Sequence, residues 1–313
     1  MPENQTRRIT HGAMMVALFT ILLAISTYIP LLNIVTIWFI SLPVAWYSAK
    51  YSRSSSLLVA IVSVAMSTLI CGIMTLPLAI VVAVIGFVIG DIIRSKKSKI
   101  FLLMTTAFVV LISITIEYIV SVKLFNIDIL KEMTMNIRKS YEKSNEIAKA
   151  MTGQAPISAE QLNTMIDTIQ MGMPTIITLL VFFLTFIIIS VNLPLLHRLG
   201  IEVPKFAPFR DLRLPRAILW YYLAVLIITL FMKPDVGSFI YIVVLNLSFL
   251  LSMLFLLQGI SCIHFFMYQQ GWPKWTAYVG TILAFPLSSF VILLGITDLG
   301  FNIRGLISGM TRK

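Results

Sequence analysis

Ionisable side chains inside apolar runs are the residues of this sequence best suited to chemistry. A charged side chain at the centre of a bilayer costs about 3 kcal/mol on insertion scales, so such a residue is a functional candidate by default. Glu117 is the only acidic residue well inside an apolar run, and it precedes Lys123 by six positions. The carboxylate either binds a proton or a cationic ligand, or it reaches the interface and pairs with Lys123. Glu117 is the first candidate ligand-binding residue.

Uncharged polar side chains inside the apolar runs form a second group. Most such residues bond across helices for about 0.6 kcal/mol each, whereas those that face a cavity bind a polar ligand. The group comprises Ser113, Thr115, Asn192, Asn246 and Gln258. Asn192 is the second candidate ligand-binding residue.

Sequence motifs of catalysis and of cofactor binding are missing. No glycine-rich loop ends in Gly-Lys-Ser/Thr, and no serine lies in a Gly-x-Ser-x-Gly turn. The histidines are scattered without a partner four residues away, which argues against a helical zinc site: His11, His197 and His264. Cys71 and Cys262 lie in apolar runs and predict neither a disulfide nor a metal cluster. We expect no enzyme, no cofactor and no metal.

Stripes of small residues mark two of the apolar runs. In the first, Ala13 and Ala17 share one helical face with Thr20 and Ala24. Gly86 and Gly90 form a G-x-x-x-G pair in another. Small side chains allow a second helix to approach closely. Each stripe predicts either packing within this chain or docking of a partner, and Ala13 and Ala17 are candidate docking residues.

Basic residues precede one of the later apolar runs. Arg210, Arg213 and Arg216 recur every third position. The arrangement indicates contact with lipid phosphates or docking of a partner, so Arg210 and Arg213 are further docking candidates. Near the end of the chain, Asp298 and Arg304 are spaced to form an ion pair.

Composition sets the class of protein that must position these residues. Of 313 residues, 58% are hydrophobic and only 12% are charged, too few to coat soluble domains of this size. The net charge of +11 gathers at the ends of the apolar runs, which favours contact with lipid headgroups over binding of nucleic acid. The sequence predicts a multi-pass protein of the inner (plasma) membrane.

The apolar runs predict an all-α, polytopic transmembrane helix bundle of eight or nine spans, since about 20 residues cross the hydrocarbon core as a helix. The larger share of Lys and Arg lies on the side of the N-terminus, which predicts a cytoplasmic N-terminus. The last three apolar runs leave open whether the chain has eight or nine spans, and therefore on which side of the membrane the C-terminus lies. The predicted spans are 10–29, 34–49, 57–73, 76–93, 100–122, 173–196, 217–232, 239–266 and 275–294.

One polar segment, 123–172, separates an N-terminal membrane half (1–122) from a C-terminal half (173–313). Its apolar residues recur at helical spacing, and Ser158 with Gln161 forms a capping-box pattern before a second helix. We expect an extracytoplasmic helical hairpin here, with a solvated loop as the alternative.

The start of the chain resembles the S-components of energy-coupling-factor vitamin transporters. The likeness rests on Arg7-Arg8 followed by Ala13-x-x-x-Ala17 at the opening of the first span. It implies that this alanine face docks on a transporter scaffold subunit and that separate ATPase subunits supply energy. A small-molecule substrate would then bind between helices near the outer side. The long outer segment and the extra spans depart from that family.

The whole chain resembles the YybS-like family of uncharacterised bacterial membrane proteins. The likeness rests on the layout of the spans and on two strings, PFRDLRLPRAILWYY (208–222) and LGITDLGFNIR (294–304). It implies an integral membrane protein and no particular reaction.

Two functions follow from these observations. The first is a substrate-binding or transport component, S-component-like, that relies on separate ATPase subunits. The alternative is a membrane scaffold or regulator that recruits envelope partners through the outer hairpin. Stabilisation by one member of a ligand panel distinguishes the first from the second.

Overall fold

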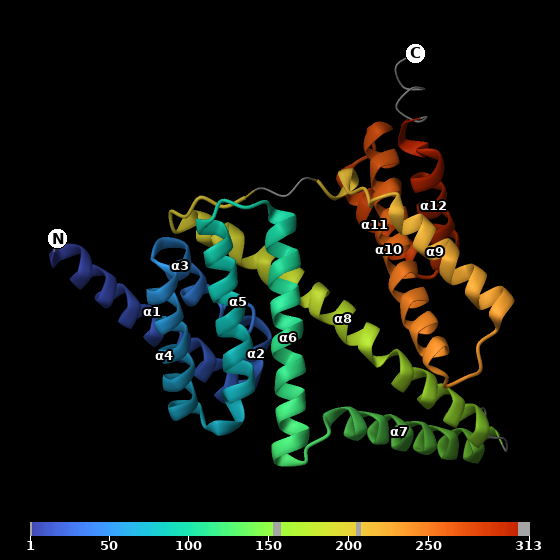
Figure 1. Ribbon diagram of the computed structural model, residues 1–313, viewed down its shortest axis with the longest axis horizontal. Helices are drawn as coiled ribbons and strands as arrows, with labels where there is room; N and C mark the ends of the chain where they lie inside the picture. Colours follow the sequence, from blue (N-terminus) through green and yellow to red (C-terminus); the bar gives the residue numbers. More distant parts are fainter. Residues whose placement is uncertain (1, 153–157, 205–207, 306–313) are drawn as a thin grey trace. The chain divides into compact units, whose positions relative to one another are not determined.

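The computed structural model describes residues 2–152, 158–204 and 208–305, and all regular structure in these ranges is helical, which confirms the all-α fold class (Figure 1). The N-terminal part contains α1 (Pro2–Tyr28), α2 (Pro30–Thr36), α3 (Leu42–Lys50), α4 (Arg53–Cys71), the short η1 (Ile73–Thr75), α5 (Leu76–Arg94) and α6 (Lys99–Phe125). It is followed by α7 (Ile129–Thr152), α8 (Ala159–Arg198), η2 (Phe209–Asp211), α9 (Ala217–Ile227), η3 (Ile228–Met232), α10 (Phe239–Gln269), α11 (Lys274–Ala284) and α12 (Ser288–Phe301).

Six of the described helices are long and apolar enough to cross a membrane: α1, α4, α5, α6, α8 and α10. The pair α11 and α12 passes the same test only together, and the chain bends by 112° at the break between them. The described part of the chain therefore contains six or seven candidate spans instead of the eight or nine expected. The run Ala217–Met232 is a shorter apolar helix, about 24 Å long against a hydrocarbon core of about 30 Å.

The predicted span 34–49 is two short helices in the structure. α2 ends at Thr36, and α3 starts at Leu42 with Pro43 in its first turn. Proline lacks the backbone N–H, and the first turn of a helix is the place where that N–H has no partner. Pro43 therefore favours the start of a new helix over continuation of the preceding one. Neither piece is long enough to span alone, but together they return the chain to the level at which α1 begins, where the Tyr47 hydroxyl of α3 donates to the Arg8 carbonyl of α1.

α8 merges two elements that the sequence predicts as separate. The second helix of the expected hairpin and the sixth predicted span form one helix of 40 residues, and Pro174 lies inside it. The predicted capping box is confirmed at its start, where the Ser158 N–H donates to Gln161 Oε1 at 2.9 Å and the Gln161 N–H to Ser158 Oγ at 3.2 Å. Next to the proline, the Asn246 amide from α10 donates to the Met171 carbonyl at 2.7 Å and accepts from the Thr175 N–H at 3.2 Å.

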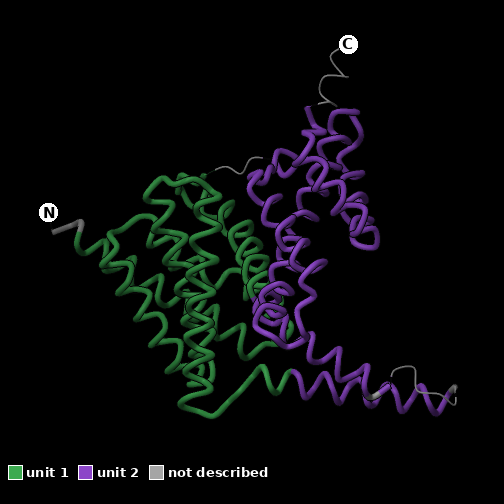
Figure 2. Tube along the Cα trace, turned by 45° about the vertical axis from the view of Figure 1, so that its right-hand side comes forward, with its two compact units in different colours: residues 1–133, 178–206 green, residues 134–177, 207–313 purple. Residues whose placement is uncertain are grey.

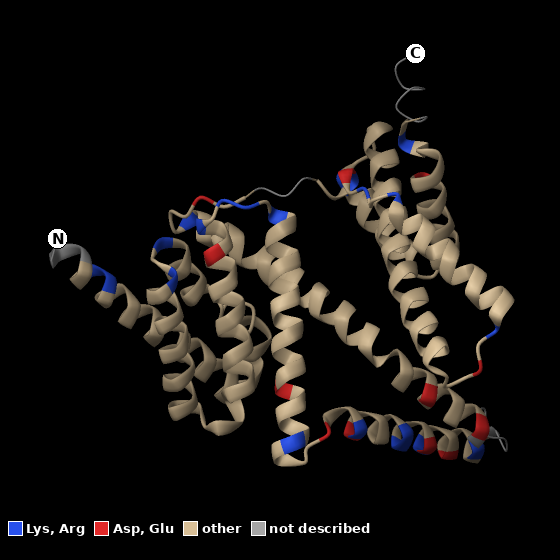
Figure 3. Ribbon diagram, in the orientation of Figure 1, with Lys and Arg blue, Asp and Glu red and all other residues tan. Residues whose placement is uncertain are grey.

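Charged residues of both signs are distributed along α7, whereas the other described helices carry their charged residues mainly near their ends (Figure 3). α7 is not among the candidate spans, in agreement with the helix expected in the polar segment. Its extracytoplasmic side remains a prediction.

The chain divides into two compact units and passes from one to the other within α7, within α8 and between Phe206 and Ala207 (Figure 2). Unit 1 comprises Met1–Met133 and Thr178–Phe206. Its core includes Phe19, Leu23, Val44 and Ala79. The Gly86 and Gly90 pair packs within the chain: a Cβ atom on Gly86 would lie 2.5 Å from the Ser41 carbonyl oxygen, and one on Gly90 would overlap the Ala45 carbonyl oxygen. This stripe therefore serves the packing of α5 on α3.

Unit 2 comprises Thr134–Ile177 and Ala207–Lys313. α10 and α12 pack with their backbones nearly touching, because a Cβ atom on Gly259 would overlap the Val291 carbonyl oxygen and one on Gly295 that of Phe255. Leu256, Ile260, Ala284 and Val291 form a buried cluster next to this crossing.

Candidate functional site

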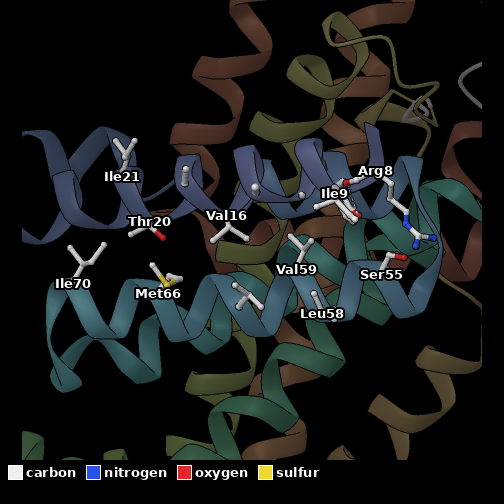
Figure 4. A pocket seen from close by; sticks show the side chains of 15 residues that line it. Arg8, Ile9, Val16, Thr20, Ile21, Ser55, Leu58, Val59, Met66 and Ile70 are labelled. Atoms are coloured by element: carbon white, nitrogen blue, oxygen red, sulfur yellow. Dashed lines mark hydrogen bonds between the residues drawn. The ribbon is translucent and has the colours of Figure 1, made fainter. Parts of the chain in front are cut away.

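α1 and α4 of unit 1 enclose a groove with a volume of about 640 Å³ (Figure 4). Its walls are mostly aliphatic and include Val16 and Ile21 from α1 and Leu58, Met66 and Ile70 from α4. Between membrane spans, carbon surface of this kind is complementary to apolar groups through van der Waals packing, since lipid tails are as apolar as the groove itself.

Small side chains on α1 create the space. Ala13 and Ala17 line the groove and are exposed along it. At Gly12 the helices come close, since a Cβ atom there would lie 3.2 Å from Val59 Cγ2. Thr20 lies one turn beyond Ala17; it is 5% exposed, and its hydroxyl has no hydrogen-bond partner among the described residues. A buried hydroxyl normally has a partner, so Thr20 is an exception in the wall of this groove.

One end of the groove is polar and positively charged. Figure 4 shows Arg8 and Ser55 at this end and Ile21 and Ile70 towards the other. Arg8 is half-buried, and its guanidinium forms no ion pair with a carboxylate among the described residues. The Tyr47 hydroxyl donates to the Arg8 carbonyl at 3.3 Å, which ties α1 to α3 at this level.

The first turn of α4 adds backbone donors to the same end. α4 starts after Ser52, and no side chain caps its N-terminal N–H groups. Uncapped N–H groups and the helix dipole favour an anion at this position. Ser55 lies in this turn and lines the groove, and its hydroxyl is 3.0 Å from that of Ser52.

Neighbouring polar contacts fix the helices that form this end. His11 Nδ1 and the Tyr51 hydroxyl are 2.5 Å apart, and the rings of Tyr47 and Tyr51 stack with centroids 4.5 Å apart. Asp91 of α5 accepts from Arg53 Nε at 2.9 Å and also pairs with Arg94, as their spacing in the sequence indicates. These bonds occupy Arg53 and Arg94, whereas Arg8 has no carboxylate partner among the described residues.

The two predicted ligand-binding residues do not line this groove. Asn192 of α8 is fully buried and donates to the Trp38 and Ile188 carbonyls at 2.9 and 2.8 Å, while its Oδ1 atom is buried without a partner. Glu117 of α6 is half-buried, and its Oε1 atom has no hydrogen-bond partner in the described chain. No salt bridge joins Glu117 to Lys123. Both residues remain predictions as ligand contacts.

The predicted docking residues Arg210 and Arg213 contact other residues of unit 2. The Arg210 guanidinium lies 3.6 Å from the centroid of the Tyr268 ring, and its carbonyl accepts from Arg304 at 2.7 Å. Arg213 reaches Asn302 Oδ1 at 3.5 Å. Docking of a partner at these two residues remains a prediction.

A buried polar network in unit 2 extends a contact that the sequence predicts. The expected pair of Asp298 and Arg304 is present, with Arg304 Nε 2.9 Å from Asp298 Oδ2. Gln258 donates to the same carboxylate oxygen at 2.6 Å, and Ser261 accepts from Arg304 at 3.2 Å. The sequence offers one signal for this network: Gln258 and Ser261 lie three positions apart in an otherwise apolar run. Every charged group in the network has a partner, which indicates a structural role.

A search of the described ranges finds no cluster of three or more His, Cys, Asp or Glu side chains that could hold a metal ion.

The sequence matches a known family along most of its length. The model of the family described as "Predicted membrane protein (DUF2232)" matches residues 17–299. The chain belongs to this family. The uncharacterised protein YybS of Bacillus subtilis (strain 168) is 26% identical over 307 residues, which cover 96% of this chain and 98% of that protein. No solved structure matches the chain.

These comparisons confirm the expected relationship to YybS. They also show that the chain belongs to a family of predicted membrane proteins. The likeness to S-components is not shown by them, and the groove between α1 and α4 is therefore the main guide to function.

Proposed function

We propose that this membrane protein is a non-enzymatic binding component that takes an elongated, largely apolar ligand into the groove between α1 and α4. The observation that carries the proposal is the groove itself, where exposed alanines face aliphatic side chains. In the transport role that the S-component likeness implies, separate ATPase subunits would supply the energy. The protein would lie in the inner membrane with its N-terminus in the cytoplasm.

The dimensions of the groove favour a thin ligand. The part of α1 that lines it, from Arg8 to Ile21, is about 20 Å long. A volume of about 640 Å³ over that length corresponds to a cross-section of about 30 Å². An extended chain therefore matches the length and volume of the groove.

The test is ligand-dependent stability. Purified protein in a neutral detergent is screened by thermal unfolding against vitamins, nucleobases, metabolites and lipids, since a ligand of the native state raises the melting temperature. We expect Ala17→Trp, which fills the groove, to abolish the shift given by the ligand found. Leu18→Trp places the same bulk on the next residue, which is exposed and lies outside the groove, and should retain the shift. Equal shifts in both variants would refute the groove as the site.

Docking of a partner helix across the groove is the second candidate, supported by the exposure of Ala13 and Ala17. In this case the double variant Ala13→Leu/Ala17→Leu loses co-purification with membrane partners while it still inserts and unfolds cooperatively. Unchanged co-purification would argue against it. The scaffold alternative, with α7 as the recruiting element, predicts envelope partners that are retained in this double variant.

A further inference from the structure

The charge at one end of the groove defines the class of ligand more narrowly. We infer that the groove binds an anionic phospholipid, with one acyl chain lying along α1 and α4 and the headgroup phosphate at Arg8 and the first turn of α4. This inference rests on the proposed function, because it names the ligand of the same groove.

The tail part of the inference follows from shape and lining. The groove has a cross-section of about 30 Å² over about 20 Å, and aliphatic side chains from both helices line it. Ala13 and Ala17 expose only methyl groups to it. An extended hydrocarbon chain matches this lining, whereas a polar metabolite would lose its hydrogen bonds to water on entry.

The head part follows from charge complementarity. Arg8 has no carboxylate partner among the described residues, although Arg53 and Arg94 nearby both pair with Asp91. The uncapped N–H groups of α4 lie at the same end, next to Ser55. A guanidinium, a helix N-terminus and a hydroxyl together supply the donors that a phosphate accepts from.

The positions of Arg8 and Ser55 along their helices match the level of a lipid headgroup in a bilayer. Arg8 precedes the apolar part of α1, and Ser55 precedes that of α4, so both lie where a span meets the headgroup region. A phosphate at this level would leave its acyl chain parallel to the two helices, in the direction of Ile21 and Ile70. Arg7, by contrast, is exposed and does not line the groove.

The experiment compares two lipids with the same acyl chains. Full-length protein in a neutral detergent is titrated with phosphatidylglycerol or phosphatidylcholine, and bound lipid is measured by native mass spectrometry together with the melting temperature. We expect phosphatidylglycerol to bind about tenfold more tightly, because both lipids carry the phosphate but the choline ammonium of phosphatidylcholine offsets its charge near Arg8. Arg8→Gln should reduce this preference to less than about twofold, while Arg7→Gln, with the same loss of charge, should preserve it. Equal effects of the two variants, or no preference in the wild type, would overturn the inference.

The acyl chain is tested separately. Ala17→Trp should abolish binding of both lipids, Leu18→Trp should not, and Ala13→Leu provides a milder block if Ala17→Trp fails to fold. Inorganic phosphate alone should give no stabilisation. If phosphate stabilises the wild type and Ala17→Trp alike, the site holds a free anion and the lipid is excluded.

The outcomes distinguish this inference from the proposed function. Equal binding of the two lipids that is lost in Ala17→Trp would retain the groove as a ligand site and overturn only the anionic class. Lipid binding that survives both Ala17→Trp and Ala13→Leu would show that the groove is not the ligand site, and it would overturn both proposals.

Discussion

Arg304 and Asp298 form an ion pair that is almost completely buried: Arg304 Nε lies 2.9 Å from Asp298 Oδ2, and the two side chains are 1% and 3% exposed. The other nitrogens of the guanidinium donate to the Arg210 carbonyl at 2.7 Å and to Ser261 Oγ at 3.2 Å. Arg304 thus joins the end of the described chain to α10, to α12 and to the segment before α9. Desolvation of two charges is offset only because each one has several partners.

Removal of one partner should leave the other charge buried and unpaired. We expect Arg304→Gln and Asp298→Asn each to lower the free energy of unfolding by about 3–5 kcal/mol. The double variant Arg304→Met/Asp298→Leu should recover most of the loss. Thermal and denaturant unfolding in detergent measure these changes, with Arg213→Gln as the control that has a smaller effect. Single variants as stable as Arg213→Gln would show that the pair is not desolvated.

The crossing of α10 and α12 gives a matched pair of glycine variants within one helix. A Cβ atom on Gly295 would overlap the Phe255 carbonyl oxygen, whereas one on Gly300 would meet only Leu219 Cδ2 at 3.9 Å. Gly295→Ala should therefore destabilise the protein by about 1–3 kcal/mol through overpacking. Gly300→Ala should stabilise it by up to about 1 kcal/mol through helix propensity. Melting curves of the two variants check the prediction, and the same sign in both would contradict it.

Glu117 has a buried carboxylate oxygen without a hydrogen-bond partner in the described ranges of the chain. A neutral amide loses less solvation than a carboxylate in such a place, so Glu117→Gln should raise the melting temperature of the ligand-free protein. Glu132→Gln, on the exposed surface of α7, should leave it unchanged. A fall in the melting temperature of Glu117→Gln would show that the carboxylate binds a cation or a proton, the role first assigned to it.

The predicted orientation places α7 outside the cytoplasm. With Cys71 and Cys262 replaced by alanine, a single cysteine at Ser140 or Ser158 should react with a membrane-impermeant thiol reagent in intact cells. A cysteine at Lys97, between α5 and α6, should react only after lysis. The opposite pattern would invert the orientation and place the basic residues of the first half outside.

Local chemistry made some contacts predictable from the sequence. The capping box of Ser158 and Gln161 and the pair of Asp298 and Arg304 each join residues at most six positions apart, so these contacts depend only on a short stretch of backbone. Long apolar runs likewise predicted the candidate spans, because length and hydropathy depend on no partner.

Contacts between segments far apart in the chain could not be predicted from the sequence. The sequence separates the second helix of the hairpin from the span at 173–196, yet α8 continues through Pro174, with the Asn246 amide of α10 bonded to the backbone on either side. Gln258 and Ser261 join Arg304 from more than 40 positions away. The groove depends on how Ala13 and Ala17 face α4, and a stripe of small residues on one helix does not specify whether a neighbour fills the space beside it or leaves it open.

The 40 residues of α8 have a consequence for the water-exposed surface of the protein. At 1.5 Å per residue the helix is about 60 Å long, about twice the thickness of the hydrocarbon core. If its apolar part crosses the bilayer upright, roughly half of the helix must extend beyond the lipid on one side. The first turns, which contain Glu160 and Asp167, carry the charge appropriate to that exposed half. In that case the first half of α8 lies in the aqueous phase and is covalently continuous with one of the spans.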